Sequence, residues 1–474
     1  MAQINSLTKK GGLKMRDIKK SLWVLLAGTA LILYCVSPIL AAEVPLEEYM
    51  QAAKASHQRL LTWLSEVSKP YKGTKIRMIT ETTPPSDWTE EAAAEFTQAT
   101  GIEVLVERQA HPHLQEKALL DFSAKTGTYD VFNGDYSWTG KYVEAGYVIP
   151  LDDYLNDPKI TYFDYFPEDF YAGFWEGTSW KGRPYGLPYD SVVQYMFYNK
   201  NDFEAAGIVD EKGNAKFPTT PDEWIADVKK LHNPPKLYGT GVQGKRHLSV
   251  VCEYLPILWA FDGNLYDQSY NVTLNSEAGL KSLQFYRELS KYAPPGATTW
   301  TWDGVSTALQ QHIVAMSMLW DENYNAMEDP AQSKVIGQMR YGPVPSVSGK
   351  AISHYGGSSL FIPTSSKKKI PAYLFAQWAT SRPVQLLGVG KGASPTRKSI
   401  YRIPVLREMY PSFIATDAAA PVTGWRPRIP EWDDMVEVMA RELNAVLAAD
   451  KDPSAALNVM ASEIAQILEK GGYK

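Results

Sequence analysis

Residues 186–207, GLPYDSVVQYMFYNKNDFEAAG, decide the fold because they join a buried strand, a turn and the start of a helix. Residues 192–198 are apolar, β-branched or aromatic, which is typical of a strand covered on both faces. The polar pair Asn199-Lys200 ends this strand. Phe203 and Gly207 then follow at the spacing of a short helix that ends at a glycine. The stretch therefore predicts a central strand of an α/β fold.

Upstream of this stretch, strand patterns and helix patterns alternate along the chain. The strand patterns are KIRMITE (75–81), IEVLVER (102–108) and YDVFNGD (129–135), and the helix patterns lie at 88–101 and 113–127. This alternation indicates a parallel sheet with helices on its faces. Ligands of such sheets bind at the carboxyl ends of the strands, so we expect residues 82–88 and 133–138 at a binding site.

Residues 1–42 have the pattern of a secretory signal peptide: a basic leader, an apolar core at 22–36 and small residues up to Ala42. The core is shorter than the roughly 20 residues that a membrane-spanning helix needs. Tyr34 is too large to precede a lipid-modified cysteine at Cys35. We therefore expect cleavage near Ala42 and no lipid anchor. A cell with one membrane would have to tether such a protein, so we expect it in a periplasm between two membranes.

Charge and cysteine content exclude several classes of protein. The chain has 48 basic and 53 acidic residues, and the leader holds six of the basic and one of the acidic ones, which leaves 42 against 52, a net charge of −10. This balance argues against nucleic acid or an anionic membrane surface as a partner. Cys252 is the only cysteine after the leader, so no intramolecular disulfide is possible. About 430 residues exceed a single core, which predicts two lobes.

Several motifs in order resemble family 1 of the bacterial extracellular solute-binding proteins, the receptors that feed sugar ABC importers. They are the F-Y-N-K to A-G pattern of residues 186–207, DGNLYD (262–267), the Gly356-Gly357 pair, GASPTRKS (392–399) and PRIPEW (427–432). Tyr195 departs from the pattern, because the family usually has a small residue there. The resemblance covers about nine tenths of the chain after the leader.

The resemblance implies a two-lobed periplasmic binding protein fold of type II, in which each lobe is a mostly parallel sheet flanked by helices and the ligand cleft lies between lobes. A helical extension is expected at 43–73, lobe 1 at 74–187 plus 314–364, and lobe 2 at 188–313 plus 365–474. The implied partners are a carbohydrate or polyol and the ABC permease subunits in the inner membrane. No cofactor is implied, and we expect a monomer that catalyses no reaction.

Sugars and polyols present hydroxyls at their edges and C–H groups on their faces, so their sites combine polar groups with aromatic plates. Asp135 and Trp138 are the first candidates, because they end a predicted strand. The alternative is that Asp135 caps a helix and Trp138 packs in the core. Tyr189 and Asp190 lie at the expected crossing between lobes and could bind ligand or cap the turn. Trp88 could stack on a ligand or staple a helix.

Further candidates come from later segments. Glu253 and Tyr254 follow a strand-to-helix turn at the expected carboxyl edge of lobe 2, although Glu253 could equally be solvated. Trp320 and Glu322 end the strand that returns from lobe 2, where receptors of this family often place a stacking tryptophan and polar partners.

The last candidates are backbone and guanidinium donors. At Tyr355, Gly356 and Gly357, backbone amides could approach the ligand because glycine lacks a Cβ, and the alternative is a tight turn or bulge. Arg426 could reach the cleft or form a surface salt bridge.

Other site types are weakly indicated. His111 and His113 lie close together but lack the companions that a zinc site uses, so we expect no metal. The competing functional hypothesis is an exported carbohydrate-active enzyme, in which Asp135, Glu253 and Glu322 supply an acid and a base. Glycosidases need two carboxyls roughly 5 to 9.5 Å apart, a distance that the sequence does not reveal.

Overall fold

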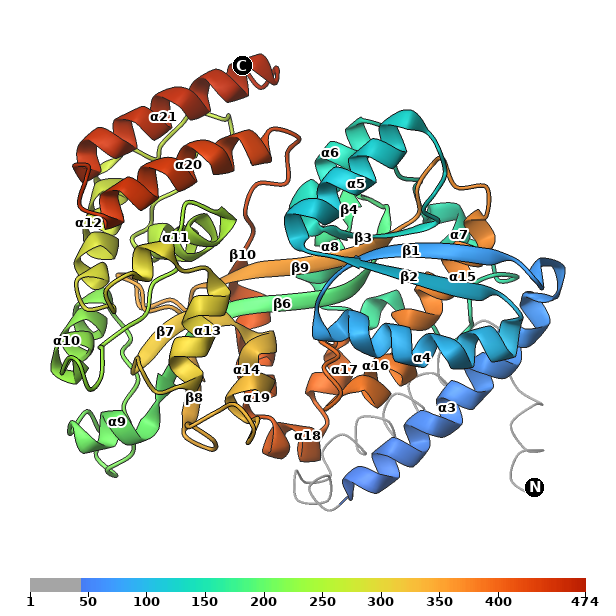
Figure 1. Ribbon diagram of the computed structural model, residues 1–474, viewed down its shortest axis with the longest axis horizontal. Helices are drawn as coiled ribbons and strands as arrows, with labels where there is room; N and C mark the ends of the chain where they lie inside the picture. The colour runs from blue at the N-terminus through green and yellow to red at the C-terminus, as the bar shows by residue number, and fades with distance from the viewer. Residues whose placement is uncertain (1–43) are drawn as a thin grey trace, which may run out of the picture. The chain divides into compact units, whose positions relative to one another are not determined.

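Strand β6 (Gly186–Asn199) is the longest strand in the structure, a computed structural model that describes residues 44–474 (Figure 1). All 14 of its residues are buried, which confirms the predicted strand with both faces covered. Helix α9 (Lys200–Ala205) follows directly, and the Asn199 side chain caps it by accepting a hydrogen bond from the backbone N–H of Asn201 (2.9 Å). The predicted signal peptide at residues 1–42 lies outside the described residues.

Strand β6 belongs to an eight-stranded mixed sheet. Its other strands are β1 (Lys75–Glu81), β2 (Glu103–Gln109), β3 (Val131–Asp135), β7 (Met316–Trp320), β8 (Met339–Gly342), β9 (Ser353–Phe361) and β10 (Thr423–Gly424). The main order is β2-β1-β3-β9-β6-β7, with β10 beside β9 and β8 beside β6. The pairs of β1 with β2 and β3 are parallel, whereas β9 pairs antiparallel with β3 and β6. The sheet is therefore mixed rather than mostly parallel, because β6 and β9 run in opposite directions through its middle.

One hydrophobic core, which we call the core of lobe 1, covers one face of β1 and β3 through Met78 and Val131. It includes residues of α4 (Pro84–Thr100) and α15 (Lys369–Ala379), and Ile79 and Phe132 point to a smaller cluster on the opposite face. This alternation is the period of two expected for a strand covered on both sides. Helix α4 begins earlier than predicted because two prolines occupy its first turn, and it ends at Gly101 in the left-handed region (φ +69°).

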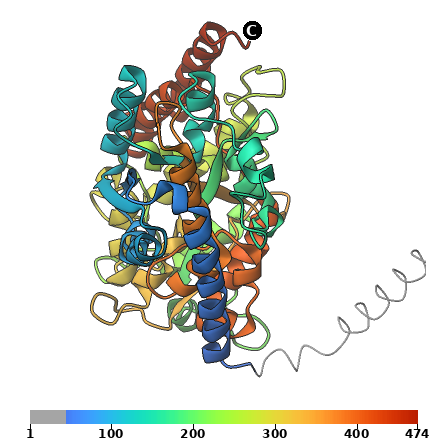
Figure 2. The same cartoon turned by 90° about the vertical axis from the view of Figure 1, so that its right-hand side faces the viewer.

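Helix α3 (Leu46–Val67) forms most of the predicted helical extension at residues 43–73 and is seen at the front of Figure 2. Its Leu60 and Leu64 belong to the core of lobe 1. The Trp378 indole also donates a hydrogen bond to Nε2 of His57 (3.0 Å). The second half of this helix is therefore an integral part of lobe 1.

A second and larger core defines lobe 2. It is built by α10 (Pro221–Leu231), α11 (Leu248–Ala260), α12 (Glu277–Ser290), α20 (Trp432–Leu447) and α21 (Pro453–Lys470), which lie together in Figure 1. Trp224, Tyr254 and Trp432 are among its largest buried side chains.

Two late segments of the chain pack in the other core than the predicted lobe boundaries imply. Met316 and Met318 of β7, expected in lobe 1, pack in the core of lobe 2 because β7 pairs with the second half of β6. Tyr373 and Trp378 of α15, expected in lobe 2, pack in the core of lobe 1. Helix α15 follows β9, which crosses between the lobes, and β7 pairs with β6, the other crossing strand. Hydrophobic patterns do not show in which core such segments pack.

The crossing itself is made by β6 and β9. Their pairing begins at Gly186 and Phe361, beside the core of lobe 1, and β6 continues to Met196 in the core of lobe 2. The register shifts between Pro188 and Asp190, opposite Ser359 and Ser358. This irregularity lies where the chain passes from one lobe to the other, near the predicted crossing at residues 184–189.

Tyr195 on β6 is fully buried and stacks with Phe197, with ring centroids 5.5 Å apart. It lines an apolar cavity of about 340 Å³ together with Tyr341 of β8 and residues of α19 (Pro411–Ala419). Its departure from the family pattern therefore affects the side of the sheet that α19 covers.

Short elements complete the structure. They are η1 (Lys69–Tyr71), α5 (His111–Ala124), η2 (Tyr136–Trp138), α6 (Thr139–Glu144), α7 (Asp152–Asn156), η3 (Pro167–Asp169), α8 (Ala172–Gly177), β4 (Ser179–Trp180), β5 (Arg183–Pro184), η4 (Ala297–Thr299), α13 (Trp302–Gln310), η5 (Asp321–Asn323), α14 (Tyr324–Met327), α16 (Arg382–Gly388), α17 (Lys398–Tyr401), α18 (Pro404–Met409) and η6 (Ala420–Val422). Within residues 44–474, no helix has the length and apolar character needed to cross a membrane.

Candidate ligand-binding cleft

A cavity of about 670 Å³ takes its lining from both lobes and from the crossing strands. The carboxyl ends of β1, β3 and β7 meet here, and they supply Glu81, Asp135 and Trp320. Lobe 2 adds the loop before α11 and the first turn of α13. The position agrees with the rule that ligands bind at the carboxyl ends of the strands. Its volume lies in the usual range of small-molecule sites.

Seven of the predicted site residues line this cavity: Asp135, Asp190, Trp320, Glu322, Gly356, Gly357 and Arg426. They come from segments that are far apart in the sequence. The family resemblance implies a single cleft between the lobes, and the structure places these segments around one cavity.

Asp135 is held by a buried guanidinium. Nη2 of Arg426 donates to both carboxylate oxygens of Asp135 (2.7 and 2.6 Å), and Nη1 donates to Sγ of Cys252 (3.2 Å). The backbone N–H and hydroxyl of Ser137 also donate to Asp135 (2.7 Å each), so the helix-capping alternative is confirmed. His111 lies 3.6 Å away. Asp135 therefore has little capacity left to accept ligand hydroxyls.

The charge of Asp135 is fixed by these neighbours. Burial acts to raise the pKa of Asp135, but Arg426, His111 and Ser137 outweigh it and hold the pKa well below its usual range. The pKa of His111 is raised in turn: burial lowers it, and the hydrogen bond to Asp135 and the charge of Glu81 outweigh that effect. Burial also raises the pKa of Cys252 to about 11, which keeps this thiol protonated. The result is an ionised carboxylate that is neutralised within the protein.

Three other carboxyl side chains, Glu81, Asp190 and Glu322, lack such a partner. None of the ion pairs found in residues 44–474 includes them. Burial, together with the charges of Glu81 and Asp321, raises the pKa of Asp190 to about 7. Burial and the charges of Asp190 and Glu81 likewise raise the pKa of Glu322 well above its ordinary value. This wall of the cavity therefore groups three carboxyl side chains that repel one another when ionised and that form no ion pair within residues 44–474.

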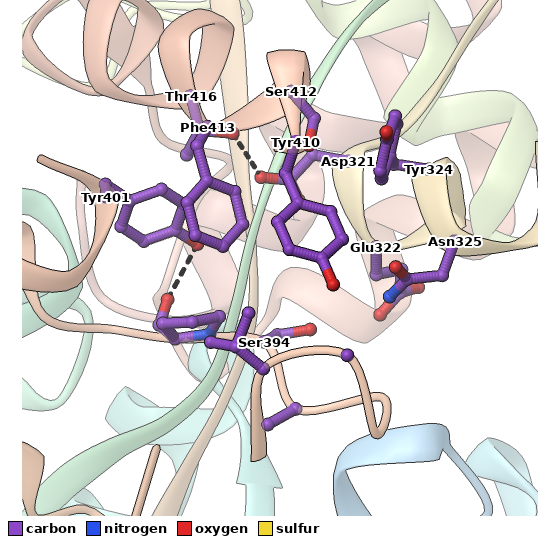
Figure 3. A pocket seen from close by; sticks show the side chains of 14 residues that line it. Asp321, Glu322, Tyr324, Asn325, Ser394, Tyr401, Tyr410, Ser412, Phe413 and Thr416 are labelled. Carbon is purple, nitrogen blue, oxygen red and sulfur yellow. Dashed lines mark hydrogen bonds between the residues drawn. The ribbon is translucent and has the colours of Figure 1, made fainter. Parts of the chain in front are cut away.

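Glu322 is presented to the cleft by its neighbour. Asp321 accepts hydrogen bonds from the backbone N–H of Val193 (3.1 Å) and from Oγ1 of Thr416 (2.7 Å), and Figure 3 shows the second bond. These bonds fix η5 against β6. Glu322 and Asn325 line both the large cavity and an adjoining pocket of about 40 Å³.

Two glycines of β9 shape the aromatic wall. A Cβ on Gly356 would lie 2.7 Å from the indole ring of Trp320, so only glycine lets this ring lie against the strand. Gly357 has a positive φ (+102°), and a Cβ there would collide with the carbonyl oxygen of Asp190. Both glycines line the cavity, and they pair with Val192 and Ser191, next to the irregularity of β6 between Pro188 and Asp190.

Two predicted tryptophans lie outside the cavity. Trp138 is 3% exposed and lies nearly parallel to Phe132 (centroids 6.3 Å apart, 11° between planes), so the core-packing alternative describes it. Trp88 packs against the core of lobe 1, with the Lys391 ammonium 4.8 Å from its ring centroid. The early start of α4 explains why Trp88 does not line the cavity, because Trp88 lies within this helix rather than on a loop at the end of the strand.

Four other predicted residues point away from the cavity. The Tyr189 hydroxyl donates to the carbonyl of Pro85 (2.9 Å), and the Tyr355 hydroxyl donates to that of Ala420. Both neighbour a cleft residue on the same strand, and successive side chains of a strand point to opposite faces.

Glu253 and Tyr254 are similarly displaced on α11. Glu253 accepts hydrogen bonds from the backbone N–H of Gln243 (2.7 Å) and from Tyr286, and the Tyr254 hydroxyl bonds Oγ of Ser282 (2.9 Å). Both side chains are buried in lobe 2, and the preceding residue of α11, a cysteine, faces the cavity instead.

Several lining residues were not predicted, among them Glu81, His111, Lys245, Trp302 and Asp303. A signal was present for Glu81, which ends β1 next to the expected ligand loop. Trp302 and Asp303 begin α13, and their role in lining the cleft depends on how lobe 2 packs.

Two lobes joined by crossing strands around one large cavity define a two-lobed ligand-binding protein. Residues 80–386 match the model of the family described as bacterial extracellular solute-binding protein. The chain belongs to this family.

Known proteins agree with this assignment. A solute-binding protein of Agrobacterium radiobacter, solved in complex with ribitol, has a TM-score of 0.75 and 28% identity, covering 83% of this chain and 99% of its own. A protein of Sinorhizobium fredii, named "Probable amino-acid ABC transporter periplasmic-binding protein", is 26% identical, with 86% of this chain and 93% of its own length covered. A mannitol-binding protein of Pseudomonas aeruginosa is 24% identical over 76% of this chain and 85% of its own. The predicted periplasmic binding protein fold is confirmed.

Proposed function

We propose that this protein is the periplasmic receptor of an ABC importer, which captures a sugar or sugar alcohol and delivers it to the permease subunits in the inner membrane. The observation that carries the proposal is the cavity of about 670 Å³, which combines buried carboxyl groups with the face of Trp320. Carboxylates accept hydroxyl hydrogen bonds strongly, and indole faces pack against C–H groups. The relatives that bind ribitol and mannitol support a small polyhydroxylated ligand.

The crossing strands suggest how binding is signalled. Because β6 and β9 contribute to both lobes and also line the cavity, a ligand can bridge the lobes and favour the closed form. The permease would then recognise the closed receptor. A monomer suffices for this cycle.

The enzyme alternative loses two of the three carboxyl groups on which it was based. Glu253 is buried in lobe 2 and bonded to Tyr286, and Asp135 is tied to Arg426. Neither is available as a general acid or base toward a ligand in the cavity. A receptor that performs no chemistry therefore accounts better for the site.

A thermal-shift screen of sugars, sugar alcohols and amino acids tests the proposal. A ligand at one hundred times its Kd stabilises the native state by about 2.7 kcal/mol, which corresponds to a rise in Tm of about 3 °C for a chain of this size. We expect at least one sugar or sugar alcohol to give this rise. If only amino acids raise the Tm, or no compound does, the ligand assignment is wrong.

A further inference from the structure

We propose that the ligand of this cleft carries a protonated amino group on its polyhydroxylated skeleton, and that Glu81, Asp190 and Glu322 bind this group. The inference rests on the proposed function and names the ligand class more closely: an amino sugar or an aminoalditol rather than a neutral sugar or alditol. Three structural features support it.

The first feature is an imbalance of charge within the cavity. Its lining contains Lys245 and Arg426 as cations besides two histidines. Arg426 is used by Asp135 and Cys252, and His111 also pairs with Asp135. Lys245 takes part in none of the ion pairs of the described chain, and the same holds for the three carboxyl groups. Asp135 thus has ion-pair partners, whereas Glu81, Asp190 and Glu322 have none among residues 44–474.

The second feature is a pair of unsatisfied polar atoms on this wall. Among residues 44–474, Oδ1 of Asp190 and Oγ of Ser358 find no hydrogen-bond partner, although the two residues are only 6% and 7% exposed. They are paired in register across β6 and β9, and both line the cavity. Buried polar atoms are normally bonded, so a ligand donor belongs here. An ammonium group offers three donors and no acceptor.

The third feature is the neighbourhood of the acidic wall. Trp320 and Trp302 line the same cavity, and the indole face attracts a cation as well as C–H groups. No three acidic, histidine or cysteine side chains of residues 44–474 are arranged to hold a metal ion. The wall is therefore better suited to a charged group attached to a larger skeleton than to a bare cation.

The titration behaviour agrees with this geometry. Burial and neighbouring acids raise the pKa of Asp190 to about 7 and raise those of Glu81 and Glu322, so ionisation of these groups is disfavoured in the empty cleft. A bound cation favours their ionised forms, whereas a neutral ligand leaves the repulsion among them in place.

Matched ligand pairs test the inference by isothermal titration calorimetry at neutral pH. Glucamine and sorbitol differ only by an amino group in place of one hydroxyl, and glucosamine and glucose form a second pair. We expect the amine of at least one pair to bind about tenfold tighter or more than its neutral partner, which corresponds to about 1.4 kcal/mol. The Glu322→Gln variant should lose most of this preference, measured as the ratio of the amine and neutral affinities in the same variant. Glu277→Gln, on an exposed surface of α12, is the matched control and should keep the preference.

The outcomes separate this inference from the proposed function. If neutral sugars or sugar alcohols bind at least as tightly as their amines, the inference is overturned and the carbohydrate receptor stands. If neither neutral compounds nor amines bind, the proposed function fails and the inference fails with it. A preference for amines that Glu322→Gln and Asp190→Asn both leave unchanged, in variants with normal melting curves, overturns the assignment to the acidic wall.

Discussion

The buried pair of Arg426 and Asp135 yields a quantitative prediction for the variant Arg426→Met. The two side chains are 3% and 12% exposed, and Arg426 supplies two hydrogen bonds to the carboxylate. In the variant, Asp135 keeps its bonds from Ser137 and its contact with His111, 3.6 Å away, but loses its guanidinium partner. Removing one partner of a buried ion pair costs about 3 to 5 kcal/mol, because the other charge stays buried and unpaired.

Urea unfolding followed by tryptophan fluorescence measures this free energy. We expect Arg426→Met to unfold about 3 to 5 kcal/mol more easily than the wild type, and the double variant Arg426→Met/Asp135→Asn to recover more than half of the loss. Because the low pKa of Asp135 depends first on Arg426 among its favourable contacts, the loss in the single variant should shrink in acid, where Asp135 takes up a proton. A loss below about 1 kcal/mol, or no recovery in the double variant, would contradict the account of this pair.

Three further predictions concern other parts of the site. Trp320→Ala should weaken ligand binding about tenfold with a modest effect on stability. Trp138→Ala should leave binding nearly unchanged and cost about 3 to 5 kcal/mol of unfolding free energy. Titration calorimetry and urea unfolding separate the two variants, and the reverse pattern would refute the assignment of the cleft wall. Gly357→Ala should lower the unfolding free energy by clearly more than about 1 kcal/mol, because the new Cβ would collide with the Asp190 carbonyl. The control Gly349→Ala also has a positive φ (+68°) but no neighbour within 4 Å of a Cβ, and it should cost about 1 kcal/mol. Equal melting temperatures of the two variants would contradict the predicted collision with the Asp190 carbonyl. Asp190 has a folded-state pKa of about 7 against an ordinary 3.8, so it binds more protons when folded, and its contribution to stability falls as pH rises between these values. Asp190→Asn should therefore gain stability relative to the wild type above pH 7 but not near pH 4. A pH-independent difference in Tm would show that the raised pKa is wrong.

Local patterns predicted most elements of the fold. The apolar run at 192–198 identified β6, and the strand and helix alternation before it identified β1 to β3 with their helices. These features depend on neighbours within a few residues, which a single sequence displays directly. The cores in which β7 and α15 pack depend on long-range contacts, which local patterns do not display.

The candidate site was predicted to within one residue at several positions. Asp190 lines the cavity but Tyr189 does not, because adjacent side chains of a strand point to opposite faces. The bulge before Asp190 determines which of these side chains points to the cavity. The partnership of Asp135 with Arg426 joins residues 291 positions apart, and no local pattern reveals it. The sequence therefore showed which segments meet in the cleft, whereas the structure shows which side chains face it.

The central claim is that the cavity beside Trp320 captures a small polyhydroxylated ligand. Titration calorimetry of the wild type with the compounds that raise its Tm tests this most directly, in parallel with the double variant Asp190→Asn/Trp320→Ala. The account predicts a Kd near 1 μM, about −8 kcal/mol, for at least one sugar, sugar alcohol or amino derivative, and a loss of about a hundredfold or more in the double variant. Binding of equal strength in a folded double variant, or no binding of any such compound to the wild type, would contradict it.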